Sequence, residues 1–161
     1  MAIDKVRAYF RTLGIAERIM EFEVSSATVE LAAQALGCEP CRIAKTLSFY
    51  GSGEEGAARV LLIVAAGDAK VANPKFKQQF GVKAKMLTHE DAERLIGHAV
   101  GGVCPFAVNE GVQVFLDESL RRFDVVYPAC GSSNSGIGLT LPELEQYAKA
   151  AGWVDVCKDW N

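Results

Sequence analysis

The chain has 161 residues, of which 50% are hydrophobic and 23% are charged. It is therefore long and apolar enough to bury the core of one ordinary domain, and it does not have the composition of a disordered protein. Its formal net charge of −3 argues against a protein that coats nucleic acid through charge alone. No apolar run reaches the roughly 18 residues that span a bilayer, and the first residues lack a secretion signal. We expect a single domain, residues 1–161, in the cytoplasm.

Helical and strand patterns alternate along the chain in an irregular order. Periodicity, capping residues and terminal glycines predict helices over 3–13, 28–36, 73–80, 88–96 and 140–151. Apolar and alternating runs predict strands over 45–50, 59–66, 83–87, 112–116 and 123–127, with a short helical piece over 117–121. This interleaving is too irregular for a strict βαβ array, so the sequence favours a mixed sheet with helices packed on it.

The five cysteines are odd in number and unevenly spaced, which indicates reduced thiols. Cys38 and Cys41 form a CxxC pair, but the pair follows a helical pattern, whereas a thioredoxin-like motif follows a strand. The other cysteines and both histidines are scattered singly and supply no second pair for a zinc site. The sequence therefore predicts no metal and no other cofactor.

Lys45 is the first candidate functional residue. In a strand over 45–50 it shares a face with Leu47 and Phe49, while Thr46 and Ser48 face the other way. A lysine on an apolar face must extend its ammonium group to solvent or meet an anion, and its compact charge suits a phosphate. The spacing alone leaves both interpretations open.

Two segments rich in small residues are the next candidates. In the segment from Gly101 to Phe106, a glycine pair lets the backbone approach a ligand and present its N–H groups, and Pro105 stiffens the exit. The segment 129–136 is a run of small, hydrogen-bonding residues after an expected strand, which can form an anion-binding nest. Both segments are also compatible with ordinary turns.

A lysine-rich stretch lies between Asp68 and Glu90 and contains no acidic residue. Its members are Lys70, Lys75, Lys77, Lys83 and Lys85. In an acidic protein such a stripe can follow a phosphate backbone, although a solvated face of a helix and strand explains it equally well. We take Lys70, Lys75 and Lys77 as the candidate RNA-binding residues.

In this order and spacing, the motifs resemble the YbaK-type aminoacyl-tRNA deacylase family, the freestanding relatives of the editing domain of bacterial prolyl-tRNA synthetases. The resemblance covers nearly the whole chain and is carried by the segments 28–33, 42–47, 101–105, 114–117 and 131–135. It implies an α/β (α+β mixed) fold, with a curved mixed β-sheet of about six or seven strands surrounded by helices. It also implies trans-editing, the hydrolysis of the ester that joins a wrong amino acid to the 3′ end of a tRNA.

The resemblance assigns roles to residues of this chain. It places the functional lysine on Lys45 and the ester-holding loop on Gly101 and Gly102, which we therefore expect to be catalytic. The expected substrate-binding residues are Val103, Cys104, Pro105, Phe106, Gly131, Ser132, Ser133 and Asn134. Asp117 lies in a matching stretch and is given only a supporting role.

Cys104 carries two hypotheses. As a small side chain it would line the pocket and tune substrate size. As a nucleophile it would need a lowered thiol pKa and an adjacent base, and neither is visible in the sequence.

The expected partner is the aminoacylated 3′ end of tRNA, with prolyl-tRNA synthetase as a second partner and with neither membrane nor DNA. The expected substrate is tRNA-Pro carrying a small amino acid such as Ala, Cys, Ser or Thr; with a cysteinyl ester, attack by the substrate's own thiol would replace hydrolysis. Two alternatives remain: a tRNA- or nucleotide-binding module without catalysis, and a thiol oxidoreductase that uses Cys38 and Cys41.

Overall fold

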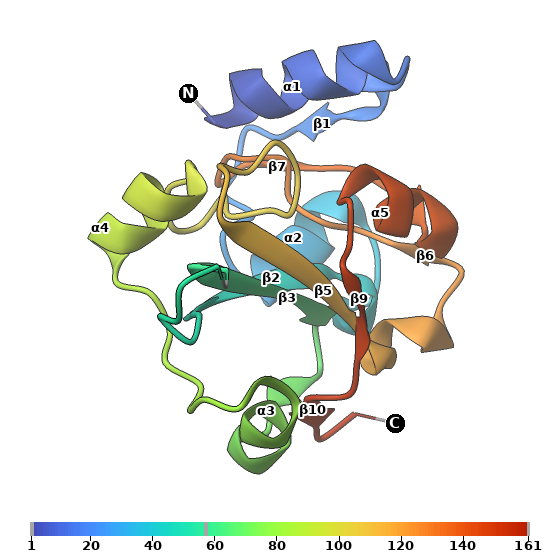
Figure 1. Ribbon diagram of the computed structural model, residues 1–161. Coiled ribbons are helices and arrows are strands. Elements are labelled where there is room, and N and C mark those ends of the chain that lie inside the picture. Colours follow the sequence, from blue (N-terminus) through green and yellow to red (C-terminus); the bar gives the residue numbers. More distant parts are fainter. Residues whose placement is uncertain (1, 57, 161) are drawn as a thin grey trace.

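The centre of the molecule is a mixed sheet of four strands in the order β2-β3-β5-β9. The computed structural model describes residues 2–56 and 58–160. Strands β2 (Ala44–Tyr50) and β3 (Val60–Ala66) are antiparallel, whereas β5 (Val112–Asp117) and β9 (Gly152–Val154) run parallel to β3 (Figure 1). Every residue of β3 is buried, because an inner strand with both faces covered is surrounded by apolar side chains. The predicted mixed sheet is confirmed.

Three two-stranded ladders surround the central sheet. They pair β1 (Met20–Glu21) with β7 (Ser135–Gly136), β4 (Lys70–Val71) with β10 (Cys157–Lys158), and β6 (Val125–Val126) with β8 (Leu139–Thr140). All three ladders are antiparallel. The sheet of about six or seven strands expected from the resemblance is thus distributed over a four-stranded centre and these short pairs.

Helices lie around the sheet (Figure 1). The α-helices are α1 (Ala2–Thr12), α2 (Val29–Leu36), α3 (Asn73–Phe80), α4 (His89–Asp91) and α5 (Leu141–Tyr147). Shorter helical turns are η1 (Ala16–Arg18), η2 (Pro40–Arg42), η3 (Ala92–Ile96) and η4 (Glu118–Arg122). Figure 1 shows α1 and α3 at opposite ends of the molecule, with the sheet between them. In the described part of the chain, none of the helices has the length and apolar character needed to cross a membrane.

The helix starts follow from local capping. The Thr28 side chain accepts a hydrogen bond from the backbone N–H of Leu31, and Thr140 forms a complete capping box with Glu143, as both sequence patterns predict. The last helix ends at Tyr147, earlier than expected, because Lys149 has a left-handed backbone (φ 51°) that no helix continues through. The chain then enters β9, which the sequence analysis did not predict.

The expected strand over 83–87 is absent. Its alternating pattern suits a strand, but only Met86 forms a bridge, opposite Phe49 at the end of β2. The expected strand over 123–127 is reduced to β6. In both cases only part of the strand-like segment lies beside a partner strand. The remaining residues form no ladder, because a strand is stabilised by its cross-strand pairs and not by its sequence pattern alone.

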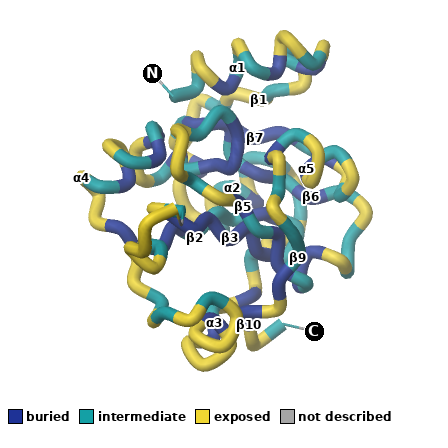
Figure 2. Tube along the Cα trace, in the orientation of Figure 1, coloured by how far each residue is buried: buried dark blue, intermediate teal, exposed yellow. Residues whose placement is uncertain are grey.

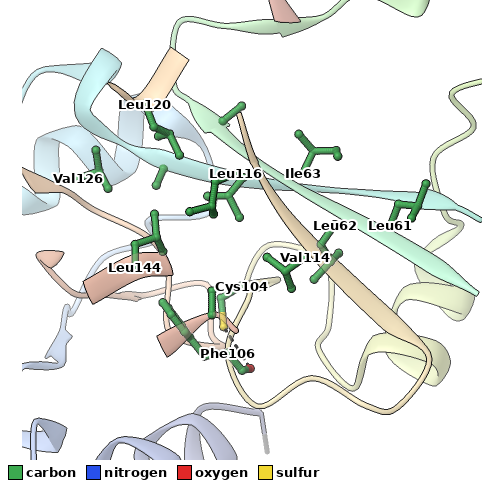
Figure 3. Packing of buried hydrophobic residues seen from close by; sticks show 14 of the residues in the cluster. Leu61, Leu62, Ile63, Cys104, Phe106, Val114, Leu116, Leu120, Val126 and Leu144 are labelled. Atoms are coloured by element: carbon green, nitrogen blue, oxygen red, sulfur yellow. Dashed lines mark hydrogen bonds between the residues drawn. The ribbon is translucent and has the colours of Figure 1, made fainter. Parts of the chain in front are cut away.

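The two faces of the sheet bury different clusters. On the α3 face, the rings of Phe49 and Phe76 lie 4.8 Å apart, and Phe80 packs against Phe115 at 5.0 Å. Figure 3 shows Val114 and Leu116 on the side of the sheet that faces Cys104 and Phe106. Figure 2 shows the sheet strands mostly buried and α3 largely exposed on its outer side.

Asp117 joins the end of β5 to the last segment of the chain. Its fully buried carboxylate accepts hydrogen bonds from the backbone N–H groups of Ser119 and Val156, both at 2.9 Å. The Ser119 hydroxyl in turn accepts from the N–H of Ala66 at 3.1 Å. Asp117 therefore supports the fold at the carboxyl ends of β3 and β5.

Replacement of Asp117 by alanine should lower the free energy of unfolding by about 3 kcal/mol, because two buried N–H groups lose a charged acceptor. Urea denaturation measures the effect. Asp124, which is exposed, provides the matched control, and Asp124→Ala should change stability by less than about 0.5 kcal/mol. Equal stabilities of the two variants would contradict this role.

Candidate functional site

A cleft of about 560 Å³ opens between α2 and the outer edge of β2. Two further segments complete its wall: the loop that contains Gly101 and Val103, and the chain from Tyr127 to Ala129 with Ser135. Apolar side chains such as Val29, Ala32 and Leu47 line much of the cleft. A mostly apolar cleft with a few polar groups is typical of small-ligand sites.

The cleft exists because the outer edge of β2 is only partly paired. At one end of the strand, the N–H of Ala44 donates to the carbonyl of Tyr127 (3.1 Å). At the other end, the N–H of Leu87 donates to the carbonyl of Ser48 (3.2 Å) and that of Tyr50 to the carbonyl of Lys85 (2.9 Å). The middle of this edge is left to the cleft.

Lys45 lines the cleft, and its ammonium group is held by the backbone. Nζ donates hydrogen bonds to the carbonyl oxygens of Gly67, at 3.3 Å, and Ala69, just after the end of β3. Burial lowers the pKa of this half-buried ammonium group from its ordinary value. An ammonium group has three N–H donors, so these two carbonyls leave one of them unused.

The two loops predicted from the sequence meet at the cleft. A Cβ on Gly102 would lie 2.7 Å from main-chain atoms of Ser132, so only glycine allows this approach. The carbonyl of Ser133 accepts a hydrogen bond from the N–H of Ser26 (2.6 Å), which joins a third segment to the pair of loops. Gly101, Val103, Ser26 and Ser135 line the cleft directly.

Other predicted substrate-binding residues lie elsewhere. Pro105 is buried and borders a separate cleft beside Tyr9, and a Cβ on Gly131 would meet the backbone of Ala2 at 2.9 Å. Ser132 and Asn134 bond to each other (3.0 Å), and Asn134 donates to the carbonyl of Phe22 (2.9 Å). Gly131, Ser132 and Asn134 thus shape and anchor their loop, while Ser133 is exposed.

Cys104, expected to line the pocket, instead lies in the hydrophobic core with Phe106, and both are fully buried. Val103 lines the cleft, whereas the next residue, Cys104, and Phe106 point toward the sheet near Val114 (Figure 3). Burial raises the pKa of the Cys104 thiol to about 12. Its sulfur lies 3.7 Å from Nδ1 of His98, but burial also lowers the pKa of His98. This neutral pair does not provide the activated thiolate that a nucleophile requires.

The candidate RNA-binding lysines lie outside the cleft lining. Nζ of Lys75 is 3.0 Å from both Asp155 Oδ1 and the carbonyl of Cys157. Lys70 is exposed on β4, directly opposite Lys158 on β10, and Lys77 is exposed on α3. The ammonium groups of Lys70 and Lys77 are therefore more available to a phosphate than that of Lys75, which is engaged by Asp155.

Several cleft residues were missed by the sequence analysis. They are polar or flexible side chains, namely Ser26, Thr46, Ser48, Met86 and His89. The alternation in β2 places Thr46 and Ser48 on the face away from Lys45, but no local pattern reveals that β2 is an edge strand. Both faces of an edge strand can border a cleft.

The described residues contain no cluster of three or more His, Cys, Asp or Glu side chains that could hold a metal ion. Nor does any described aspartate or glutamate line the cleft. Cys38 and Cys41 are free thiols, and burial raises the pKa of Cys38. The cleft thus combines an apolar wall, hydroxyl and backbone groups, and one ammonium group.

Comparison with known protein families matches residues 23–147 to the aminoacyl-tRNA editing domain. The chain belongs to this family. The editing-domain match includes α2, Lys45 and both loops of the cleft, so the family and the mixed α/β fold predicted from the sequence are confirmed.

Relatives of this editing-domain protein include freestanding proteins and parts of larger enzymes. It is 49% identical to the uncharacterised protein YwhH of Bacillus subtilis, with 100% of both chains covered. It is 26% identical over 110 residues to proline–tRNA ligase of Limosilactobacillus fermentum, a match that covers 68% of this chain and 19% of the ligase. A crystal structure described as that of a candidate trans-editing enzyme for prolyl-tRNA synthetase superimposes with a TM-score of 0.85 at 27% identity, covering 98% of this chain and 97% of the other.

The buried thiols should be inert in the folded protein. At pH 8 a thiol with a pKa of about 12 is almost entirely protonated, so iodoacetamide should alkylate Cys104 and Cys157 about a thousandfold more slowly than an ordinary exposed thiol. Mass spectrometry of time-resolved labelling measures this, with partly exposed Cys41 as the internal control. Labelling of Cys104 as fast as that of Cys41 would contradict its burial.

Proposed function

We propose that the protein is a trans-editing aminoacyl-tRNA deacylase that hydrolyses the ester of tRNA-Pro mischarged with a small amino acid such as Ala, Cys, Ser or Thr. The observation that carries the proposal is the meeting of Lys45 with the glycine loop at one cleft, in a chain of the editing-domain family. The likeness to a segment of proline–tRNA ligases supports the choice of tRNA, and it makes prolyl-tRNA synthetase the natural second partner.

The chemistry required is modest. A water oxygen bonds to the carbonyl carbon of the ester, the bond to the ribose oxygen breaks, and the proton lost by water ends on that leaving oxygen. Negative charge develops on the carbonyl oxygen, and the backbone N–H of Gly101, which lines the cleft, is suited to stabilise it. The N–H of Gly102 is already donated to the carbonyl of Ala99 (3.1 Å) and fixes the turn of the loop. The remaining N–H of Lys45 would anchor the 3′-terminal nucleotide and so hold the ester in place.

The side chains of the cleft favour catalysis by positioning. With no described carboxylate in the lining, the proposal assigns no side chain as general base. The high pKa of the Cys104 thiol removes the support for a covalent intermediate on that residue. Small side chains such as Ala32 and Val103 border the cleft, and a pocket of this kind separates neighbouring amino acids by about 1–3 kcal/mol per methylene group.

The thiol oxidoreductase alternative finds little support. Cys38 follows the end of α2, and Cys41 lies within the three-residue turn η2, whereas a thioredoxin-like pair follows a strand and opens a full helix. Burial also raises the pKa of Cys38.

Replacement of Lys45 by alanine should lower kcat/KM for deacylation by about 100-fold, because the 3′-terminal nucleotide loses its charged anchor and the ester loses its position. The assay uses alanyl-, cysteinyl-, seryl- and threonyl-tRNA carrying the proline anticodon. Lys149→Ala, on the exposed side away from the cleft, is the matched control and should keep wild-type activity. If the wild-type protein binds tRNA but turns over none of the four esters, the binding module without catalysis replaces this proposal.

The double substitution Lys70→Ala with Lys77→Ala should weaken tRNA binding by about tenfold at low salt. It should also reduce the slope of the logarithm of the binding constant against the logarithm of the salt concentration by about two. Filter binding at several salt concentrations measures both effects. Lys75→Ala should have a smaller effect, because its ammonium group is already engaged by Asp155. Binding that is unchanged in the double variant would place the RNA elsewhere on the surface.

A further inference from the structure

Thr46, in the middle of β2, has a side-chain hydroxyl without a hydrogen-bond partner. Its Oγ1 atom is buried and makes no hydrogen bond to any described residue, although the residue as a whole is partly exposed and lines the cleft. A buried hydroxyl without a partner is unfavourable. A rotation of about 120° about χ1 would carry Oγ1 to another staggered position, and such a rotamer would be needed to present the hydroxyl to the cleft.

The backbone of Thr46 is unpaired on the same edge. In an antiparallel ladder, alternate residues direct their N–H and C=O groups toward the partner strand and away from it. Ala44, Ser48 and Tyr50 use their outward groups to bond to Tyr127, Leu87 and Lys85, and the ladder with β3 is continuous from Ala44 to Tyr50. The outward N–H and C=O of Thr46 lie between these bonds, with no partner in the described ranges.

Thr46 therefore offers two hydrogen-bond acceptors on this edge, its carbonyl oxygen and, in the rotated side chain, its hydroxyl, beside one backbone N–H donor. A group with at least two hydrogens satisfies both, which favours a primary ammonium group over a hydroxyl. Lys45, on the opposite face of β2, disfavours a cation on its own side and leaves the Thr46 side for it.

The position also fits the reacting bond. Thr46 pairs with Val64 in the ladder with β3, and Ser48 pairs with Leu62. Leu62 in turn pairs with Val114, which Figure 3 shows on the side of the sheet toward Cys104, so the side chain of Thr46 shares its face of the sheet with the loop that contains Cys104. In an aminoacyl ester the α-ammonium group is one carbon away from the ester carbonyl. An ammonium group on Thr46 would place that carbonyl beside the loop of Gly101 and Val103.

We propose that Thr46 binds the α-ammonium group of the aminoacyl ester through its hydroxyl and its main-chain carbonyl. This inference rests on the proposed deacylase function and adds a specificity-determining residue to it. The site then selects esters of free amino acids, and it discriminates against acyl groups that lack an α-amino group.

The test compares two esters of the same tRNA: the aminoacyl ester that the wild-type protein hydrolyses fastest, and its desamino counterpart. Thr46→Val replaces the hydroxyl by a methyl group of similar size. We expect it to lower kcat/KM about tenfold for the aminoacyl ester and to leave the desamino ester unchanged. Thr46→Ser, which keeps the hydroxyl, should retain most of the wild-type preference, and Thr12→Val in exposed α1 is the control.

The same variants give a second readout. Because Thr46→Val removes a buried hydroxyl without a partner, its thermal midpoint should equal or exceed that of the wild type. An equal loss on both esters, or no loss on either, would overturn the role of Thr46 while leaving the deacylase proposal intact. Failure of the wild-type protein to hydrolyse any of the aminoacyl esters would instead overturn the deacylase proposal and this inference together.

Discussion

The partial pairing of the outer edge of β2 determines where this molecule can bind a ligand. Tyr127 closes one end of the edge and residues 85–87 close the other, so the backbone between them faces a cleft. An exposed strand edge is normally a liability, because it can pair with another chain. Here only its centre is open, beneath α2 and the glycine loop, so the gap admits a small polar group and excludes a strand.

The electrostatics of the cleft follow from the same arrangement. Burial lowers the pKa of Lys45, and two backbone carbonyls hold its ammonium group. With carboxylates absent from the described lining, the field is set by one cation and by neutral dipoles. Such a site favours the developing anion of an ester hydrolysis and depends on fixed positions more than on proton transfer.

Local chemistry allowed much of the fold to be predicted from the sequence. The caps at Thr28 and Thr140 depend on neighbouring residues, and the buried run of β3 identifies an inner strand. The predicted positions of Lys45 and Gly101 at one cleft agree with the structure, and their catalytic roles stay predictions. Contacts between distant segments could not be predicted from the sequence, because no local pattern encodes them. They include the inward turn that buries Cys104, the edge position that borders the cleft at Thr46, and the approach of Gly102 to Ser132.

The ladder between β4 and β10 makes the support of Lys45 depend on a segment that is synthesised much later than Lys45 itself. Ala69, whose carbonyl holds Lys45, directly precedes β4, and β4 is fixed by residues 156–158 through its ladder with β10 and the bond from Ala72 to Val156. A ribosome therefore makes Lys45 early, but the support of its ammonium group is complete only after residues 156–158 have emerged. Helix α2 and the β2–β3 hairpin can form early during translation, whereas the support of the Lys45 ammonium group has to wait until residues 156–158 have been made.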